Sequence, residues 1–219
     1  MINVYLCRHA GYRYSGFSAA FCYKYFQQTL ATGAVERIFL LGPSHHVHFY
    51  GCVLPEPEIS IYETPIGHLD LDTKTLSTLS SSKMFKSIGK QQDEDEHSLE
   101  MHLPYIRKVL DLTNMANKVT LVPVMVGDLS ASNKSAQDYG EVFAPYLDDP
   151  ANLFVVSSDF CHWGERFGYT HYNAEKGKIH ESIEALDKEG MATIESGSLS
   201  KFTSYLKKTK NTICGRHPI

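Results

Sequence analysis

The strongest constraint on the fold is a short apolar run that ends in a turn and is followed at once by histidines. Apart from Glu36 and Arg37, residues 35–41 are apolar, and a Gly-Pro pair stops the run. This is the pattern of a short buried strand. Past it stand His45, His46 and His48. Ligands bind at the carboxyl ends of strands in open α/β sheets, so we expect His45 to be a ligand or catalytic group and the other two to be surface residues.

Two other predicted strands, residues 2–7 and 152–157, also end shortly before a histidine, namely His9 and His162. Strands alternate with segments of helical periodicity, which predicts an α/β fold with helices flanking a central sheet. Pro123 lies inside a further predicted strand and favours an edge position or a bulge, because proline donates no ladder hydrogen bond. We expect a single domain whose sheet is mixed rather than purely parallel.

An early helix is predicted over residues 16–28. There Phe17, Phe21 and Tyr25 recur at helical spacing, and we expect this apolar stripe to cover one face of the sheet.

A second helix is predicted to begin near Glu96, because the acidic run before it suits a helix N-terminus, and Pro104 is expected to kink or restart it. The segment does not fit a zinc protease, since its two histidines lack the required spacing. On one helix His97 and His102 would diverge. His97 or Glu100 could hydrogen-bond to a metal ligand, but a solvated or capping face is the preferred interpretation.

Composition excludes several classes of function. The net charge of −4 gives no basic surface for nucleic acid or an acidic membrane, and no apolar run approaches a bilayer span. The cysteines are an odd, scattered set without metal-ligand spacing, which predicts free thiols and a reducing compartment, with a cytoplasmic location. These cysteines are Cys7, Cys22, Cys52, Cys161 and Cys214.

The histidines at strand ends favour metal or proton chemistry. Two histidines and one anionic ligand are a known arrangement for non-heme iron, whereas a thiolate as third ligand favours copper or zinc. Cys214 is the candidate thiolate, because Arg216 and a helix expected to begin at Pro218 would lower its pKa. A small buried hydrophobic role for Cys214 is equally compatible with its spacing.

Asp159 precedes His162 by three residues at a predicted strand end. The carboxylate is expected to orient the imidazole and fix its tautomer, which favours a catalytic role for both residues. The alternative is that Asp159 caps the following turn and His162 packs on Trp163.

Four longer motifs carry a family resemblance: LGPSHH at 41–46, DEDEHSLEMHLPY at 93–105, VVSSDFCHWG at 155–164 and NTICGRHP at 211–218. They closely resemble the Memo family, mediators of ErbB-driven cell motility. The similarity runs from His9 to Ile219. It implies a fold like that of the class III extradiol (LigB-type) non-heme iron dioxygenases.

By that resemblance His9, His45 and Cys214 match the family's metal-site residues, and the implied cofactor is a copper or iron ion. His162 matches the position of the dioxygenase catalytic base. Cys214 stands where those enzymes use a glutamate, which argues against conventional extradiol dioxygenase activity. Whether the chain is an enzyme stays open.

The resemblance implies a signalling effector with a redox metal site, which links receptor tyrosine kinases to the cytoskeleton and cell migration. A second candidate function is a metal-dependent oxidoreductase acting on a small phenolic substrate. A third is an adaptor without catalysis that binds phosphotyrosine peptides of receptors or their adaptors, which requires arginines near the site. The candidates are Arg8, Arg13, Arg166 and Arg216.

The sequence departs from the family at Arg8, where the family has a proline, and family members extend beyond both ends of this chain. We therefore expect residues 1–219 to form one Memo-like domain that is incomplete at both termini. A helix at Pro218 would lack the residues for its first turn. Cys214 is then expected to lie in a loosely held chain end.

Overall fold

The computed structural model describes residues 4–219, so the first residues of the strand predicted over 2–7 lie outside the described residues. The chain divides into two compact units, which are described separately. Unit 1 comprises the residues up to Ser158 together with Pro218, and unit 2 comprises 159–217 together with Ile219. A single Memo-like domain over 1–219 stays a prediction.

Unit 1 contains the central sheet and most of the helices. Its strands are β1 (Val4–Cys7), β2 (Arg37–Pro43), β3 (Cys52–Pro55), β4 (Ile61–Thr64), β5 (Gly67–Asp70), β6 (Phe85–Ile88), β7 (Thr120–Val126) and β8 (Asn152–Ser157). Its helices are α1 (Tyr12–Leu30), α2 (Thr73–Ser81), α3 (Lys90–Asp95), α4 (His97–Glu100), α5 (Leu103–Leu112) and α6 (Ala136–Leu147).

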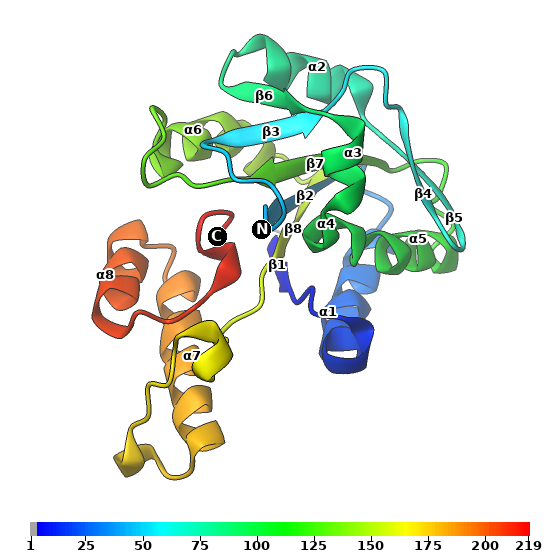
Figure 1. The fold of residues 1–219 in the computed structure, drawn as a ribbon. Coiled ribbons are helices and arrows are strands. Elements are labelled where there is room, and N and C mark those ends of the chain that lie inside the picture. The colour runs from blue at the N-terminus through cyan, green and yellow to red at the C-terminus, as the bar shows by residue number, and fades with distance from the viewer. Residues whose placement is uncertain (1–3) are drawn as a thin grey trace. The chain divides into compact units, whose positions relative to one another are not determined.

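The central sheet has six strands in the order β1-β8-β2-β7-β3-β6, which runs up the view in Figure 1. The neighbours from β1 to β7 are parallel, and β3 is antiparallel to β7. The expected α/β class with a mixed sheet flanked by helices is confirmed. Because β1, β8, β2 and β7 run the same way, their carboxyl ends lie along one edge of the sheet.

Pro123 lies in an inner strand, so the expected edge position or bulge is wrong. It pairs with Leu40 of β2, and β7 lies between β2 and β3. The ladder between β3 and β7 joins only the last two residues of β7, Met125 and Val126. The sheet therefore tolerates the missing N–H of Pro123, because the β3 ladder does not reach it.

The strand register shows which side chains share a face of the sheet, and their ring contacts show which helix covers that face. Phe39 pairs with Phe154 across β2 and β8, and the two rings stack at 4.6 Å. Phe143 of α6 contacts Phe39 edge-on at 6.1 Å. On the opposite face Tyr5 of β1 meets Phe26 of α1 at 5.7 Å. Helices α6 and α1 thus cover opposite faces.

Helix α1 turns a different side inward from the one expected. Phe17, Phe21 and Tyr25 are 80%, 54% and 60% exposed, because a second set of residues at helical spacing forms the buried side. That set is Ser15, Ala19, Tyr23, Phe26 and Leu30. Periodicity alone cannot choose between two apolar stripes of the same helix.

A disulfide joins Cys7 of β1 to Cys22 of α1, although free thiols were expected. Cys7 ends its strand on the face that α1 covers, and the two Cα atoms are 6.3 Å apart, within disulfide range. Cys52, Cys161 and Cys214 keep their thiols.

The helix predicted to begin near Glu96 consists of two short helices, α4 and α5, and the acidic residues before Glu96 lie in a third helix, α3. Glu96 separates α3 from α4 and caps α4. Pro104 lies in the first turn of α5, so the expectation that it restarts the helix is confirmed. This break turns the residues around Glu96 toward the end of β2.

Unit 2 consists of helices α7 (Ile179–Glu195) and α8 (Leu199–Thr209) and the short turns η1 (Glu165–Phe167), η2 (Ala174–Lys176) and η3 (Cys214–Arg216). Its small core contains Leu186, Phe202, Tyr205 and the fully buried Ile213. No helix among residues 4–219 combines the length and apolar character needed to cross a membrane.

The chain after Asn211 is not a loosely held end, contrary to expectation. Within unit 2 the Cys214 backbone N–H donates to the Asp159 carbonyl at 3.3 Å, and the Ile219 N–H donates to the Gly215 carbonyl at 3.0 Å. Burial of Ile213 adds a hydrophobic anchor.

Candidate functional site

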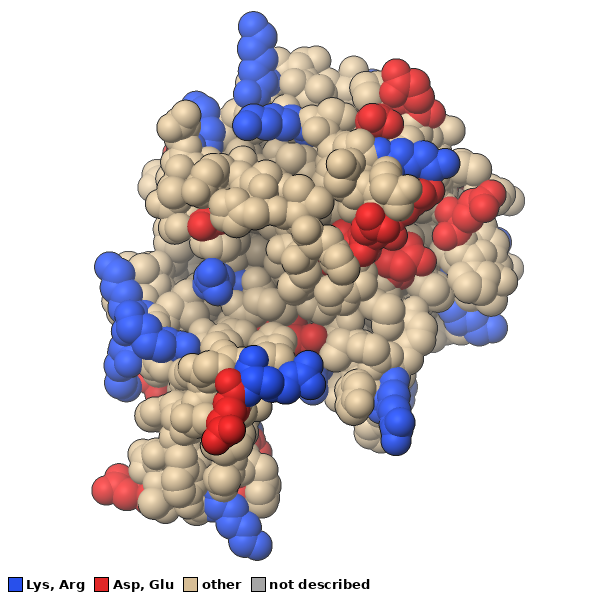
Figure 2. Space-filling view, viewed as in Figure 1, with Lys and Arg blue, Asp and Glu red and all other residues tan. Residues whose placement is uncertain are grey.

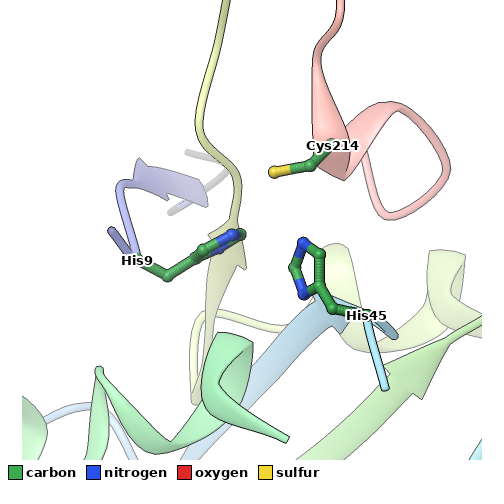
Figure 3. A group of neighbouring side chains, drawn as sticks. All are labelled: His9, His45 and Cys214. Carbon is green, nitrogen blue, oxygen red and sulfur yellow. The ribbon is translucent and has the colours of Figure 1, made fainter. Parts of the chain in front are cut away.

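Two of the predicted site residues lie together where strands of unit 1 end. His9 follows β1 and His45 follows β2, and their rings meet edge to face at 5.0 Å (Figure 3). His9 is buried, whereas the His45 side chain is 29% exposed. His46 and His48 are exposed, as expected. Parallel strands therefore bring together imidazoles that are far apart in the sequence.

Glu96 holds the His45 loop in place. Its carboxylate accepts the backbone N–H of His45 at 2.5 Å, that of His46 at 3.3 Å and that of Ser98 at 2.9 Å. It also contacts Nδ1 of His45 at 3.0 Å and Nδ1 of His97 at 3.2 Å. Burial opposes ionisation of Glu96, but these hydrogen bonds outweigh it and hold the pKa of the carboxyl below its ordinary value.

The tautomer of His45 follows from this contact. An ionised carboxylate only accepts hydrogen bonds, so Nδ1 of His45 carries the proton, and the neutral ring has its lone pair on Nε2. Ligand atoms of His45, Glu96 and His97 lie within 4.8 Å of one another. Because the Glu96 oxygens already accept hydrogen bonds from these residues, Glu96 is better suited to orient a ligand than to be one.

His9 is held from the other side by the end of β8. Its Nδ1 lies 2.6 Å from Oγ of Ser157, and Nε2 of His102 lies 2.8 Å from the same oxygen. The Tyr23 hydroxyl contacts Nδ1 of His102 at 2.9 Å. The Ser157 hydroxyl also donates to the Ser98 carbonyl at 2.7 Å. This chain of groups is buried.

His102, for which the sequence predicted no role, is fully buried, whereas Glu100 is exposed, as preferred for that residue. Burial, with a smaller effect of His9, lowers the pKa of His102 to about 3. Glu96, Ser157 and Tyr23 were also missed as site residues. The only local signal for Glu96 was its place before a helix start; the others carry none.

The remaining predicted site residues belong to unit 2. Cys214 begins η3 (Figure 3), and the backbone N–H of Asp159 lies 3.2 Å from its sulfur. Nδ1 of His162 lies 2.8 Å from the Thr212 carbonyl, which orients the imidazole. The segment 211–213 runs beside His162, and the Thr212 hydroxyl also accepts the His162 backbone N–H and donates to its carbonyl.

An acidic cavity of about 470 Å³ lies in unit 1 beside Glu96. Figure 2 shows acidic side chains gathered over α3 and the β4–β5 hairpin. Tyr62 donates a hydrogen bond to Asp93 at 2.5 Å, and burial, reinforced by the charge of Glu94, raises the pKa of Asp93 even though this bond opposes the shift. An acidic lining repels phosphate, so this cavity does not fit the expected phosphotyrosine peptide.

Comparison with known proteins decides the family. Residues 1–219 match the family described as Memo-like protein. The chain belongs to the Memo family. It is 50% identical to Protein MEMO1 of Xenopus laevis over 211 residues, which is 96% of this chain and 68% of that protein. Identity is 49% to Protein MEMO1 of Homo sapiens, with the same coverage. The Protein memo-1 homolog of Caenorhabditis elegans is 46% identical over 96% of this chain and 57% of its own length.

The family expected from the four motifs is thus confirmed, and the expected likeness to the extradiol dioxygenase fold is consistent with it. The finer assignments within this Memo chain stay predictions. These are the metal ligands His9, His45 and Cys214 and the catalytic pair His162 and Asp159.

Proposed function

We propose that this chain binds one copper or iron ion through His9, His45 and Cys214. The redox centre so formed serves a signalling effector that links receptor tyrosine kinases to the cytoskeleton and cell migration. The observation that carries the metal site is the pair of adjacent imidazoles at the strand ends, each held through Nδ1 by a buried group. This is the arrangement of metal-binding histidines, whose second nitrogen is engaged by a hydrogen-bond partner.

Support for Cys214 as the third ligand comes from chain connectivity and from its hydrogen bond. Asp159 donates its backbone N–H toward the Cys214 sulfur, which stabilises negative charge on a thiolate. Asp159 is also two residues from Ser157, which is the hydrogen-bond partner of His9. Chain connectivity therefore keeps the Cα atoms of Asp159 and Ser157 within about 7 Å of each other. The strand that holds His9 through Ser157 therefore continues directly into Asp159, whose backbone is hydrogen-bonded to Cys214.

Two imidazoles and a thiolate fit the proposed ions. A soft thiolate favours copper, and imidazole suits both copper and iron. When bound, such an ion supplies one-electron transfer. The same thiolate argues against the phenol-oxidising alternative, because extradiol-type sites use a carboxylate in its place.

Metal titration of the full chain tests the ligand set. We expect one copper or iron ion per chain, and His45→Ala or Cys214→Ser should weaken binding by more than about 100-fold, beyond the loss usual for an outer-shell partner. His48→Ala is the matched control, because it removes an exposed imidazole from the same loop.

A second experiment tests the signalling role in cells that lack the protein. Wild type and His48→Ala should restore receptor-driven migration, and the two ligand variants should not. Undiminished affinity in Cys214→Ser, or full migration with both ligand variants, would contradict the proposal and favour an adaptor.

His162 is expected to affect the centre without ligating it. Its Nδ1 is engaged by the Thr212 carbonyl, and we expect His162→Ala to lower metal affinity by no more than about 10- to 100-fold. The measurement is competition with a chelator of known affinity. Complete loss of binding would identify His162 as a primary ligand.

A further inference from the structure

We infer that Tyr23, His102 and Ser157 form a buried hydrogen-bond relay that fixes His9 as its Nδ1–H tautomer. Ser157 and His102 are then positioning residues for His9. The link to metal affinity rests on the proposed function, but the tautomer is a property of the chain without metal. The relay joins α1, the start of α5 and the end of β8 to the loop after β1.

The hydroxyl of Ser157 determines which groups donate and which accept in the hydrogen bonds of the relay. It has one hydrogen and two lone pairs. Its oxygen is 2.7 Å from the Ser98 carbonyl oxygen, which can only accept, so the hydrogen must lie between these two atoms. If it pointed elsewhere, two acceptor oxygens would face each other at that distance without a proton.

Both lone pairs of Ser157 are then available to the two imidazoles. Nδ1 of His9 at 2.6 Å and Nε2 of His102 at 2.8 Å must each donate to this oxygen. His9 is therefore protonated on Nδ1, and its neutral ring has the lone pair on Nε2. His102 is protonated on Nε2. One serine thus imposes opposite tautomers on two histidines.

The far end of the relay agrees with this assignment. With Nε2 of His102 protonated, Nδ1 of the neutral ring is an acceptor, and the Tyr23 hydroxyl at 2.9 Å donates to it. Burial raises the pKa of Tyr23 well above its ordinary value, so the phenol keeps its proton. Stacking on Tyr105, with ring centroids 4.8 Å apart, holds the Tyr23 ring. Every donor in the relay therefore meets an acceptor.

The relay matters for function because it settles which nitrogen of His9 can bind a metal. Glu96 does the same for His45 by a separate route. Both imidazoles are consequently set to offer Nε2 before any ion arrives, which removes the cost of changing tautomer on binding.

The direct test is the tautomer of each histidine in the full chain without metal. Nitrogen-15 NMR of histidine-labelled protein, with two-bond nitrogen–proton correlations, separates the two neutral forms. We expect the Nδ1–H pattern for His9 and the Nε2–H pattern for His102. The same tautomer at both residues, or Nε2–H at His9, overturns the relay. This measurement uses the wild-type chain, so it does not depend on whether a variant folds.

Variants then test the consequence for metal binding. Ser157→Ala should give His9 as a mixture of tautomers and lower copper affinity by about 10- to 100-fold. Ser157→Thr keeps a hydroxyl and should restore both readouts. Tyr23→Phe should change the His102 pattern, whereas Tyr139→Phe, which removes another buried tyrosine hydroxyl, should leave both histidines unchanged.

Two outcomes separate this inference from the proposed function. If the wild-type chain binds no copper or iron, the proposed metal site is refuted, but the measured tautomers of His9 and His102 still show whether the relay exists. If Ser157→Ala scrambles the His9 tautomer but binds copper as tightly as wild type, the positioning role is refuted.

Discussion

Glu96→Ala is expected to lower the free energy of unfolding by about 2–4 kcal/mol, the sum of a lost helix cap and at least one buried donor left without a partner. Glu96 caps α4 through the Ser98 N–H and accepts two backbone N–H groups of the His45 loop. Without it this loop loses its anchor, and the His45 imidazole loses its Nδ1 partner. We expect copper affinity to fall with stability, by about 10- to 100-fold.

Urea unfolding with Glu94→Ala as the control tests this prediction. Glu94 is exposed and pairs with Lys90 on the surface of α3 at 3.5 Å, so its loss should cost no more than about 0.5 kcal/mol. Equal midpoints for the two variants would show that the Glu96 hydrogen bonds do not stabilise the fold.

The contribution of Glu96 should depend on pH in a defined direction. Because the pKa of Glu96 is lowered in the folded protein, the unfolded chain takes up the proton first as the pH falls. The stability that Glu96 provides is therefore fully present above its ordinary pKa of 4.5 and is lost progressively below that value. The difference in unfolding free energy between wild type and Glu96→Ala should shrink over that acidic range. A constant difference would contradict the assigned ionisation.

Gly42→Ala is expected to cost about 1–3 kcal/mol, because it overpacks the point where β2, β8 and α4 meet. A Cβ at Gly42 would lie 2.7 Å from Cδ2 of Leu99, 2.8 Å from Oγ of Ser98 and 3.3 Å from Cβ of Ser157. Relief requires α4 to move, but the Ser98 hydroxyl is bonded to the Pro43 carbonyl at 2.6 Å. The substitution should therefore also disturb the positions of His9 and His45.

Gly140→Ala is the matched control for Gly42→Ala. Gly140 is exposed within α6, and a Cβ there meets nothing within 4 Å. Alanine should stabilise the helix by about 0.5–1 kcal/mol. Thermal unfolding of both variants gives the comparison, and a Gly42→Ala protein as stable as wild type would show that α4 can shift without cost.

Ser98 is the point where the supports of the two imidazoles meet. Its backbone N–H donates a hydrogen bond to the carboxylate of Glu96, which holds His45. Its carbonyl accepts a hydrogen bond from the hydroxyl of Ser157, which holds His9. A displacement of α4 is thus transmitted to both histidines. This explains why one short helix, broken from its neighbours at Glu96, matters more for the site than its length indicates.

Local sequence determined which segments form these strands and which residues follow them. The apolar run at 35–41 correctly placed His45 after a buried strand, and the apolar run at 2–7 placed His9 after another strand. The Gly-Pro pair does not stop the first strand as expected, because β2 continues through Gly42 to Pro43 and both residues pair with β7. These signals are readable because strand burial and turn chemistry are properties of a few neighbouring residues. The long motifs around them also identified the family, which the comparison confirmed.

Tertiary structure alone decided which side of α1 is buried, that Cys7 pairs with Cys22, and which groups hold the histidines. His45 and Glu96 are 51 residues apart, and His9 and Ser157 are 148 apart. No local pattern encodes such pairs, because a hydrogen-bond partner is selected by strand register and helix packing across the sheet. The sequence determined which chemical groups stand at the strand ends; only the assembled sheet determined which nitrogen of each histidine carries the proton.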